Sequence, residues 1–154
     1  MSPKELITAD AVIPALRAAN KKQVMLEISE RAAEVSGLGA REIFDALIQR
    51  ERLGSTGVGN GIAIPHGKLS KASDLFGVFA RLEKPVDFES LDGQPVDLVF
   101  LLIAPESAGA DHLTALARTA RMLRDPALVA KLRASRDPMA IYALFSQGPR
   151  SVAA

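Results

Sequence analysis

The chain has 154 residues, of which 48% are hydrophobic, and its 19 basic and 18 acidic residues leave a net charge of +1. A chain of this length buries about 70% of its unfolded surface in a single core, so folding requires neither a disulfide nor a metal. The small net charge argues against a general nucleic-acid-binding protein, and the absence of cysteine excludes thiolate catalysis. The two histidines lack the spacing of a transition-metal site, so we expect no metal and no cofactor.

No segment has the pattern of a membrane span or of a signal peptide. The longest apolar run, residues 98–105, is far shorter than the roughly 20 residues with which a helix crosses a bilayer. Residues 1–5 contain no apolar signal-peptide core. We therefore expect a soluble protein of the cytoplasm.

Two amphipathic helices are predicted in the first third of the chain. Asn20 is suited to cap the first helix, whose apolar residues repeat at helical spacing until Gly37 and Gly39 end it. The second helix has its apolar face within residues 43–48, and Gly54 is suited to the position just after its end.

Strands are predicted in the middle of the chain. A short β-branched strand leads to His66, and two longer strands cover residues 77–82 and 96–103. The last of these is apolar on both faces, as in the centre of a sheet, whereas residues 11–13 have the pattern of an edge strand.

Three helices are predicted after the strands. Ser107 or Asp111 is suited to begin the first, and Asp125 and Asp137, each followed by proline, are suited to begin the other two. Helices before and after a group of strands indicate a sheet that is covered on both faces. We therefore expect an α/β fold with three layers, α/β/α, in which helices flank both faces of a mixed central sheet.

The glycine-rich residues 54–61 first suggest the phosphate-binding loop of a nucleotide-binding protein. A Walker loop ends in Gly-Lys-Ser or Gly-Lys-Thr, but Gly67 and Lys68 are followed by Leu69. The dinucleotide pattern also fails, because the glycines alternate and the segment follows a helix instead of a strand. The sequence therefore argues against nucleotide binding, and a tight turn from helix to strand explains the glycines.

The turn does not explain His66, which stands between Pro65 and Gly67. An imidazole is largely neutral near pH 7 and then offers a nucleophilic nitrogen. The proline stiffens the backbone before the histidine, and the glycine leaves space behind it. From the residue type alone, an ordinary surface or core histidine remains the alternative to a reactive one.

One long stretch resembles the active-site region of the fructose/mannitol-type enzyme IIA proteins of the bacterial phosphotransferase system (PTS). The stretch is residues 50–69, RERLGSTGVGNGIAIPHGKL, and it is most similar to the nitrogen-regulatory subfamily. The resemblance covers nearly the full chain, including residues 94–100 and 111–113. It implies a single enzyme IIA type-2 domain over residues 1–147, after which we expect a flexible tail at 148–154.

The resemblance implies a phosphoryl carrier in which His66 accepts a phosphoryl group on Nε2 from an HPr-like phosphocarrier protein. Arg50 matches the active-site arginine of the family, and its planar guanidinium can bind phosphoryl oxygens through two hydrogen bonds. His112 matches the second active-site histidine. At a helix N-terminus its charged form is disfavoured, so we expect a neutral ring that donates one hydrogen bond. Without the resemblance, Arg50 would be a favourable cation at a helix end and His112 an ordinary helix residue.

Three further polar residues are candidates for binding or orienting the phosphoryl group. Asn60 stands where mannitol-type relatives have an acidic residue, so we expect it to orient groups or close the loop instead of acting as a base. Ser55 and Thr56 can donate hydrogen bonds from their hydroxyls, although small polar residues after a helix are usually turn formers.

Two functions follow from the resemblance, and a third explanation stays open. In the first, the phosphorylation state of His66 decides which protein targets bind, such as potassium-transport or sensor proteins of potassium, nitrogen or stress physiology. In the second, the chain is a sugar-PTS enzyme IIA that passes the phosphoryl group to an IIB partner during fructose- or mannitol-type uptake. In the third, the chain is a binding module whose His66 is never phosphorylated.

Overall fold

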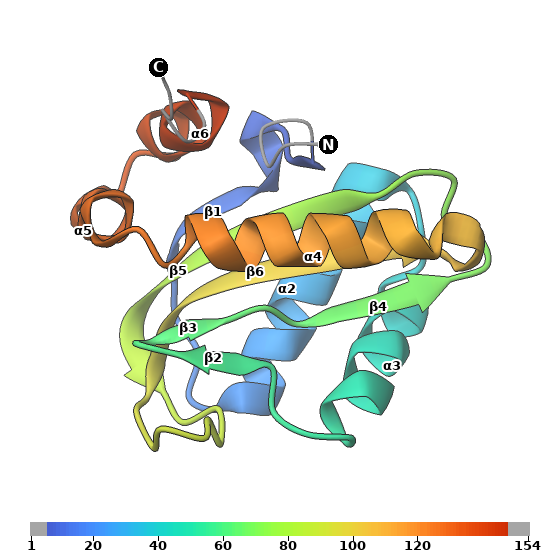
Figure 1. Cartoon of the computed structure of the whole chain (residues 1–154), viewed down its shortest axis with the longest axis horizontal. Helices are drawn as coiled ribbons and strands as arrows, with labels where there is room; N and C mark the ends of the chain where they lie inside the picture. The colour runs from blue at the N-terminus through green and yellow to red at the C-terminus, as the bar shows by residue number, and fades with distance from the viewer. Residues whose placement is uncertain (1–5, 148–154) are drawn as a thin grey trace.

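Six strands within residues 6–147 form one mixed sheet with helices on both faces, which confirms the three-layer fold (Figure 1). This computed structural model describes residues 6–147, apart from the side chain of Gln147. The predicted tail at 148–154 lies outside the described residues. The strands are β1 (Val12–Leu16), β2 (Gly57–Gly59), β3 (Ile62–Ala63), β4 (His66–Leu69), β5 (Phe76–Val86) and β6 (Val96–Pro105).

Strand β6 occupies the centre of the sheet. The strand order is β1-β5-β6-β3-β2, and β4 also pairs with β6. β5 runs antiparallel to β6, whereas β3 and β4 both run parallel to it. Every β6 residue from Leu98 to Ala104 is buried. The structure therefore confirms the central strand that is apolar on both faces, and it confirms the edge strand near residues 11–13 as β1.

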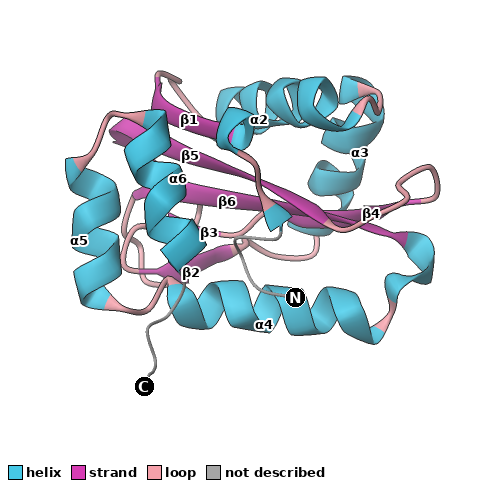
Figure 2. Cartoon of the chain, turned by 90° about the horizontal axis from the view of Figure 1, so that it is seen from above, coloured by secondary structure: helices cyan, strands magenta, loops and turns pink. Residues whose placement is uncertain are grey.

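Helices cover the two faces of the sheet, as Figure 2 shows from above. The helices are α2 (Lys21–Ser36), α3 (Ala40–Glu51), α4 (Ala110–Met122), α5 (Pro126–Ala134) and α6 (Pro138–Gln147), with the short 3₁₀ segments η1 (Ala9–Ala11) and η2 (Glu106–Ala108). Helices α2 and α3 lie on one face, and α4 lies on the other. Helix α6 packs against β1, and α3 packs against β4.

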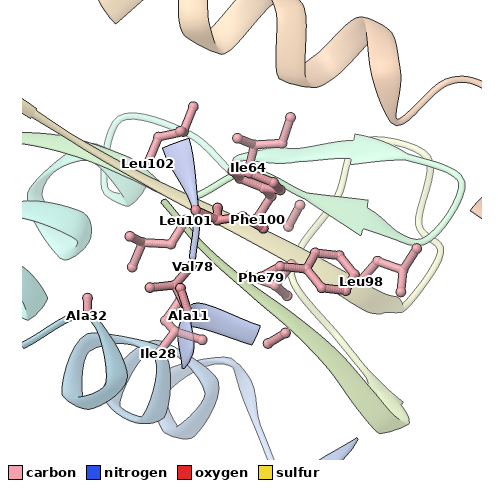
Figure 3. Close-up of a cluster of buried hydrophobic side chains, with 14 of the residues drawn as sticks. Ala11, Ile28, Ala32, Ile64, Val78, Phe79, Leu98, Phe100, Leu101 and Leu102 are labelled. Carbon is pink, nitrogen blue, oxygen red and sulfur yellow. The ribbon is translucent and has the colours of Figure 1, made fainter. Parts of the chain in front are cut away.

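The sheet separates two apolar layers of the core. In Figure 3, Val78 of β5 points toward α2, whereas Ile64 and Leu102 point to the opposite side of the sheet. Side chains two positions apart in a strand share a face, so the even-numbered residues of β6 from 98 to 102 belong to that opposite layer. Three phenylalanine rings pack there with centroids 4.9 to 6.3 Å apart: Phe79, Phe100 and Phe145.

Three predicted helix caps are present as short-range hydrogen bonds. The side chain of Asn20 accepts from the backbone N–H of residue 23 at 2.9 Å, and Gly37 ends α2 in the left-handed conformation. The side chain of Asp125 accepts from the N–H of residue 127 at 3.0 Å, and that of Asp137 accepts from the N–H of residue 139 at 3.1 Å. These bonds satisfy backbone donors that a helix leaves free at its start.

Two predicted helix boundaries are wrong. Helix α3 ends at Glu51, and Gly54 has φ +148°, so it is not a left-handed residue that ends the helix. Neither Ser107 nor Asp111 caps α4, because Ser107 lies in η2 and Asp111 lies inside α4. Gly109 takes the cap position with φ +52° and ψ −116°, a conformation that side-chain-bearing residues rarely adopt. The sharp turn between the two helices therefore requires glycine there.

Gly67 allows α3 to lie close to β4. A Cβ atom at this position would lie 3.1 Å from Ala46 Cβ and 3.3 Å from the carbonyl carbon and oxygen of Ala46. Because Gly67 directly follows His66 and Ala46 precedes Arg50 by one helical turn, this close approach brings the end of α3 toward the first residue of β4.

We expect Gly67→Val to destabilise the protein by about 1–3 kcal/mol, because the added atoms meet backbone that cannot rotate away. Urea unfolding would measure the loss in the free energy of unfolding. Gly67→Ala, which adds only the Cβ, should cost less and serves as the graded control. A valine variant as stable as the parent protein would show that α3 does not press on β4.

Candidate functional site

The strand register brings His66 and His112 together. His66 pairs with Leu102 of β6, and residues paired in register point to the same face of a sheet. Leu102 points away from α2, toward the face that α4 covers (Figures 2 and 3). His112 lies in the first turn of α4, and the two imidazole rings stand edge to face with centroids 5.6 Å apart. His66 is half-buried and His112 is buried.

A hydrogen bond shows which ring nitrogen of His66 carries the proton. Nδ1 lies 2.9 Å from the backbone oxygen of Ile64. A carbonyl oxygen only accepts, so Nδ1 must carry the proton. In the neutral ring the lone pair is then on Nε2. This is the nitrogen on which the family resemblance places the phosphoryl group.

Both imidazoles are held in the neutral form at pH 7. Burial lowers the pKa of His66 below its ordinary value of 6.5, and the charge of Arg50 lowers it further. The hydrogen bond to Ile64 and the charge of Glu51 raise this pKa, but the lowering effects are larger. Burial also lowers the pKa of His112, and the charges of His66 and Lys68 add to this. The expected neutral His112 ring is therefore favoured mainly by burial. Its Nε2 is buried and has no hydrogen-bond partner among the described residues.

Arg50 adds a cation beside the histidines. It lies in the last turn of α3 and is half-buried. Its Nη1 donates to the backbone oxygen of Gly54 at 2.9 Å, which holds the guanidinium against the loop that follows the helix. Its positive charge lowers the pKa of His66. The structure thus brings two imidazoles into contact and places a guanidinium near enough for its charge to act on His66.

The hydroxyls of Ser55 and Thr56 have acceptors within the protein. Ser55 Oγ donates to the backbone oxygen of Phe88 at 2.6 Å, and Thr56 Oγ1 donates to Oε1 of Glu51 at 2.7 Å. Each hydroxyl has a single proton, so these bonds leave none for a phosphoryl oxygen in this structure. Contact between either residue and the phosphoryl group stays a prediction.

Asn60 lies at the other end of β3, away from His66. The backbone oxygen of its neighbour Gly61 accepts from Asp97 N, whereas His66 pairs with Leu102. Those two β6 positions are about 16 Å apart along the strand, at about 3.3 Å per residue. Asn60 is exposed with φ +58°, a left-handed conformation that asparagine tolerates, so its position suits the closing of the β2–β3 turn. The structure does not bring its side chain to the histidines.

Glu51 is a site residue that the sequence analysis missed. Its side chain is only 6% exposed, and its charge acts on His66. It stands directly after Arg50 in the sequence, at a helix end where a charged residue is usually solvated. Nothing in the local pattern indicates that this carboxylate is buried.

The chain matches a family model over most of its length. The model is described as "Phosphoenolpyruvate-dependent sugar phosphotransferase system, EIIA 2", and it matches residues 5–148. The chain belongs to this family. Membership implies a role in phosphoryl transfer within a phosphotransferase system.

Several relatives of this PTS EIIA type-2 chain are nitrogen regulatory proteins. The chain is 57% identical over 149 residues to the nitrogen regulatory protein of Bradyrhizobium diazoefficiens, covering 97% of each chain. It is 42% identical over 129 residues to that of Klebsiella oxytoca, covering 83% of this chain and 80% of the relative. The crystal structure of IIA-Ntr from Neisseria meningitidis superposes with a TM-score of 0.87 and 31% identity, covering 92% and 97% of the two chains. These similarities favour a nitrogen-type EIIA over the sugar-specific alternative.

Neither a membrane helix nor a metal cluster is found in the described part of the chain. No helix within residues 6–147 combines the length and the hydropathy of a membrane span. The same residues contain no group of three or more His, Asp or Glu side chains placed to hold a metal ion.

The lowered pKa values of His66 and His112 predict how stability depends on pH. In the unfolded chain both rings gain protons as the pH falls through about 6.5, whereas the folded protein takes them up only at lower pH. The unfolded state then binds more protons, so the free energy of unfolding should be at its full value above about pH 6.5 and decrease below it.

Urea unfolding between about pH 8 and about pH 5 would measure this slope. The double variant His66→Gln and His112→Gln should show a shallower decrease, because glutamine does not titrate. NMR titration of the two rings should give midpoints below 6.5. Midpoints above that value would contradict the burial argument.

Proposed function

We propose that the chain is a nitrogen-type enzyme IIA that accepts a phosphoryl group on His66 and regulates protein targets according to its phosphorylation state. The donor in this proposal is an HPr-like phosphocarrier protein. The observation that carries the proposal is the bond from His66 Nδ1 to the Ile64 carbonyl, which leaves Nε2 as the nucleophile beside His112 and Arg50. The proposal includes a cytoplasmic location and one type-2 domain over residues 1–147.

The chemistry of the transfer follows from these groups. The Nε2 lone pair of His66 forms a bond to phosphorus while the bond to the donor nitrogen breaks and its electron pair returns to the donor. The Ile64 carbonyl stabilises the positive charge that grows on the ring through the Nδ1 proton. Arg50 and the Nε2 of His112 bind phosphoryl oxygens, so positioning and charge stabilisation supply the catalysis.

The regulatory step is electrostatic. A phosphoryl group adds about −1.5 to −2 charges to a half-buried position that otherwise has a cationic neighbour in Arg50. A protein target that binds this face therefore meets a different charge in each state. The targets we propose are proteins of potassium, nitrogen or stress physiology, including potassium-transport or sensor proteins, as the family resemblance implies.

We expect His66→Ala to abolish phosphorylation, because no other side chain of the site offers an equivalently held nitrogen. Arg50→Ala and His112→Ala should keep the acceptor but slow transfer by about 100-fold or more, as is typical when one donor to the reacting oxygens is removed. Intact mass after incubation with phosphoenolpyruvate, an enzyme I-type protein and an HPr-like carrier would measure the gain of one phosphoryl group. Circular dichroism would verify that each variant is folded.

Uptake of acid-labile phosphate by His66→Ala would contradict the proposal. A wild-type protein that gains no mass under the same conditions would favour the binding module that is never phosphorylated. Transfer onward from phosphorylated protein to a sugar-specific IIB protein would favour the sugar-uptake alternative.

A further inference from the structure

Glu51 presents a buried carboxylate whose two oxygens are both occupied. Oε2 accepts from the backbone N–H of Thr56 at 2.8 Å and forms an ion pair with Lys21 Nζ at 2.9 Å. Oε1 accepts from the Thr56 hydroxyl at 2.7 Å. A buried carboxylate is expensive to keep charged unless it is paired, so this set of partners fixes the side chain in one place.

The partners of Glu51 lead by consecutive hydrogen bonds to the reactive ring. The backbone oxygen of Thr56 accepts from the N–H of Ile64 at 3.0 Å. The backbone oxygen of Ile64 accepts from His66 Nδ1 at 2.9 Å. Ile64 directly follows β3, and its bond to Thr56 continues the antiparallel pairing of Gly57 with Ala63 by one residue on each side. Moving Thr56 would therefore move the carbonyl that orients the imidazole.

We propose that Glu51 is the positioning residue for His66, acting through Thr56 and Ile64 to hold the ring in the Nδ1–H form. Lys21, from the first turn of α2, also holds the carboxylate, because its ammonium pairs with the same Oε2 that accepts from Thr56. Thr56 is a link in this chain of hydrogen bonds, because its hydroxyl donates to Glu51 and its carbonyl accepts from Ile64. The inference rests on the proposed role of His66 as the phosphoryl acceptor, but its effect on the ring is measurable without any phosphorylation.

The charge of Glu51 also opposes that of Arg50 at the same ring. The carboxylate raises the pKa of His66 and the guanidinium lowers it. Removing the negative charge should therefore lower the titration midpoint of His66 further. The fall in the midpoint reports the charge of Glu51, whereas the tautomer of the ring reports its action through Thr56 and Ile64.

The test replaces Glu51 by glutamine, which keeps the size of the side chain and one acceptor oxygen but removes the charge. We expect ¹⁵N NMR of Glu51→Gln at neutral pH to show a weaker preference of His66 for the Nδ1–H form, and its titration midpoint to fall. Transfer from an HPr-like carrier should slow by about tenfold in kcat, with little change in the KM for the carrier, since an orienting partner of a reactive imidazole is lost.

Thr56 provides a second pair of variants that tests the link itself. Thr56→Val removes the hydroxyl but keeps the N–H bond to Glu51, so it should weaken the Nδ1–H preference in the same direction. Thr56→Ser retains the hydroxyl and should behave like the parent protein. These variants keep the proposal testable if Glu51→Gln does not fold.

Glu83→Gln is the matched control for loss of a shielded ion pair elsewhere in the fold. The Glu83 side chain is 17% exposed and pairs with Arg81 at 3.0 Å. Its replacement should lower stability without changing the His66 spectrum, titration or transfer rate.

A folded Glu51→Gln variant with the parent tautomer, midpoint and kcat would overturn the proposal and leave Glu51 a purely structural residue. Equal effects of Thr56→Ser and Thr56→Val would overturn the role of the hydroxyl. If the parent protein is never phosphorylated, the NMR results still decide whether Glu51 positions the ring, so the two proposals fail separately.

Discussion

The hydrogen bond from His66 Nδ1 to the Ile64 carbonyl determines which nitrogen of the ring can react. It depends on a break between β3 and β4, where Ile64 and Pro65 leave the strand pattern while the register with β6 stays the same on both sides. Because the register is kept, His66 still points to the face covered by α4. Ile64 donates its N–H to Thr56, Pro65 accepts from Leu102, and the Ile64 carbonyl accepts from the imidazole. The register with β6 therefore sets the direction of the His66 side chain, and the bond to Ile64 sets its protonation pattern.

The site keeps two neutral imidazoles among several charges. Burial disfavours the protonated form of both rings, and the cations Arg50 and Lys68 act in the same direction. Glu51 opposes them at His66. The resulting environment suits a dianionic phosphoryl group, because cations and a ring nitrogen without a partner are present. The nearby carboxylate of Glu51 repels the group less, because both of its oxygens are already bound by Thr56 and Lys21. Among the described residues, His112 Nε2 is a buried polar atom without a partner in the free protein, and a phosphoryl oxygen would satisfy it.

Features that depend on neighbouring residues were predictable from the sequence. The caps at Asn20 and Asp125 involve donors two or three residues away, and the burial of β6 follows from its continuous apolar run. The layer order followed from the sequence of helices and strands. The two wrong predictions, Gly54 after α3 and Ser107 or Asp111 at the start of α4, occur where the chain turns sharply and the backbone angles depend on what the next element packs against.

The sequence by itself determined the elements, the α/β class and the family resemblance that selects His66, because short-range hydrogen bonds, hydrophobic period and motif spacing are local properties. Only the tertiary structure decided which residues share the site. It placed His112 beside His66 and Asn60 at the far end of β3, and it directed the Thr56 hydroxyl to Glu51. These positions depend on strand register and burial, which arise from contacts between residues far apart in the chain. A local sequence pattern therefore does not predict them.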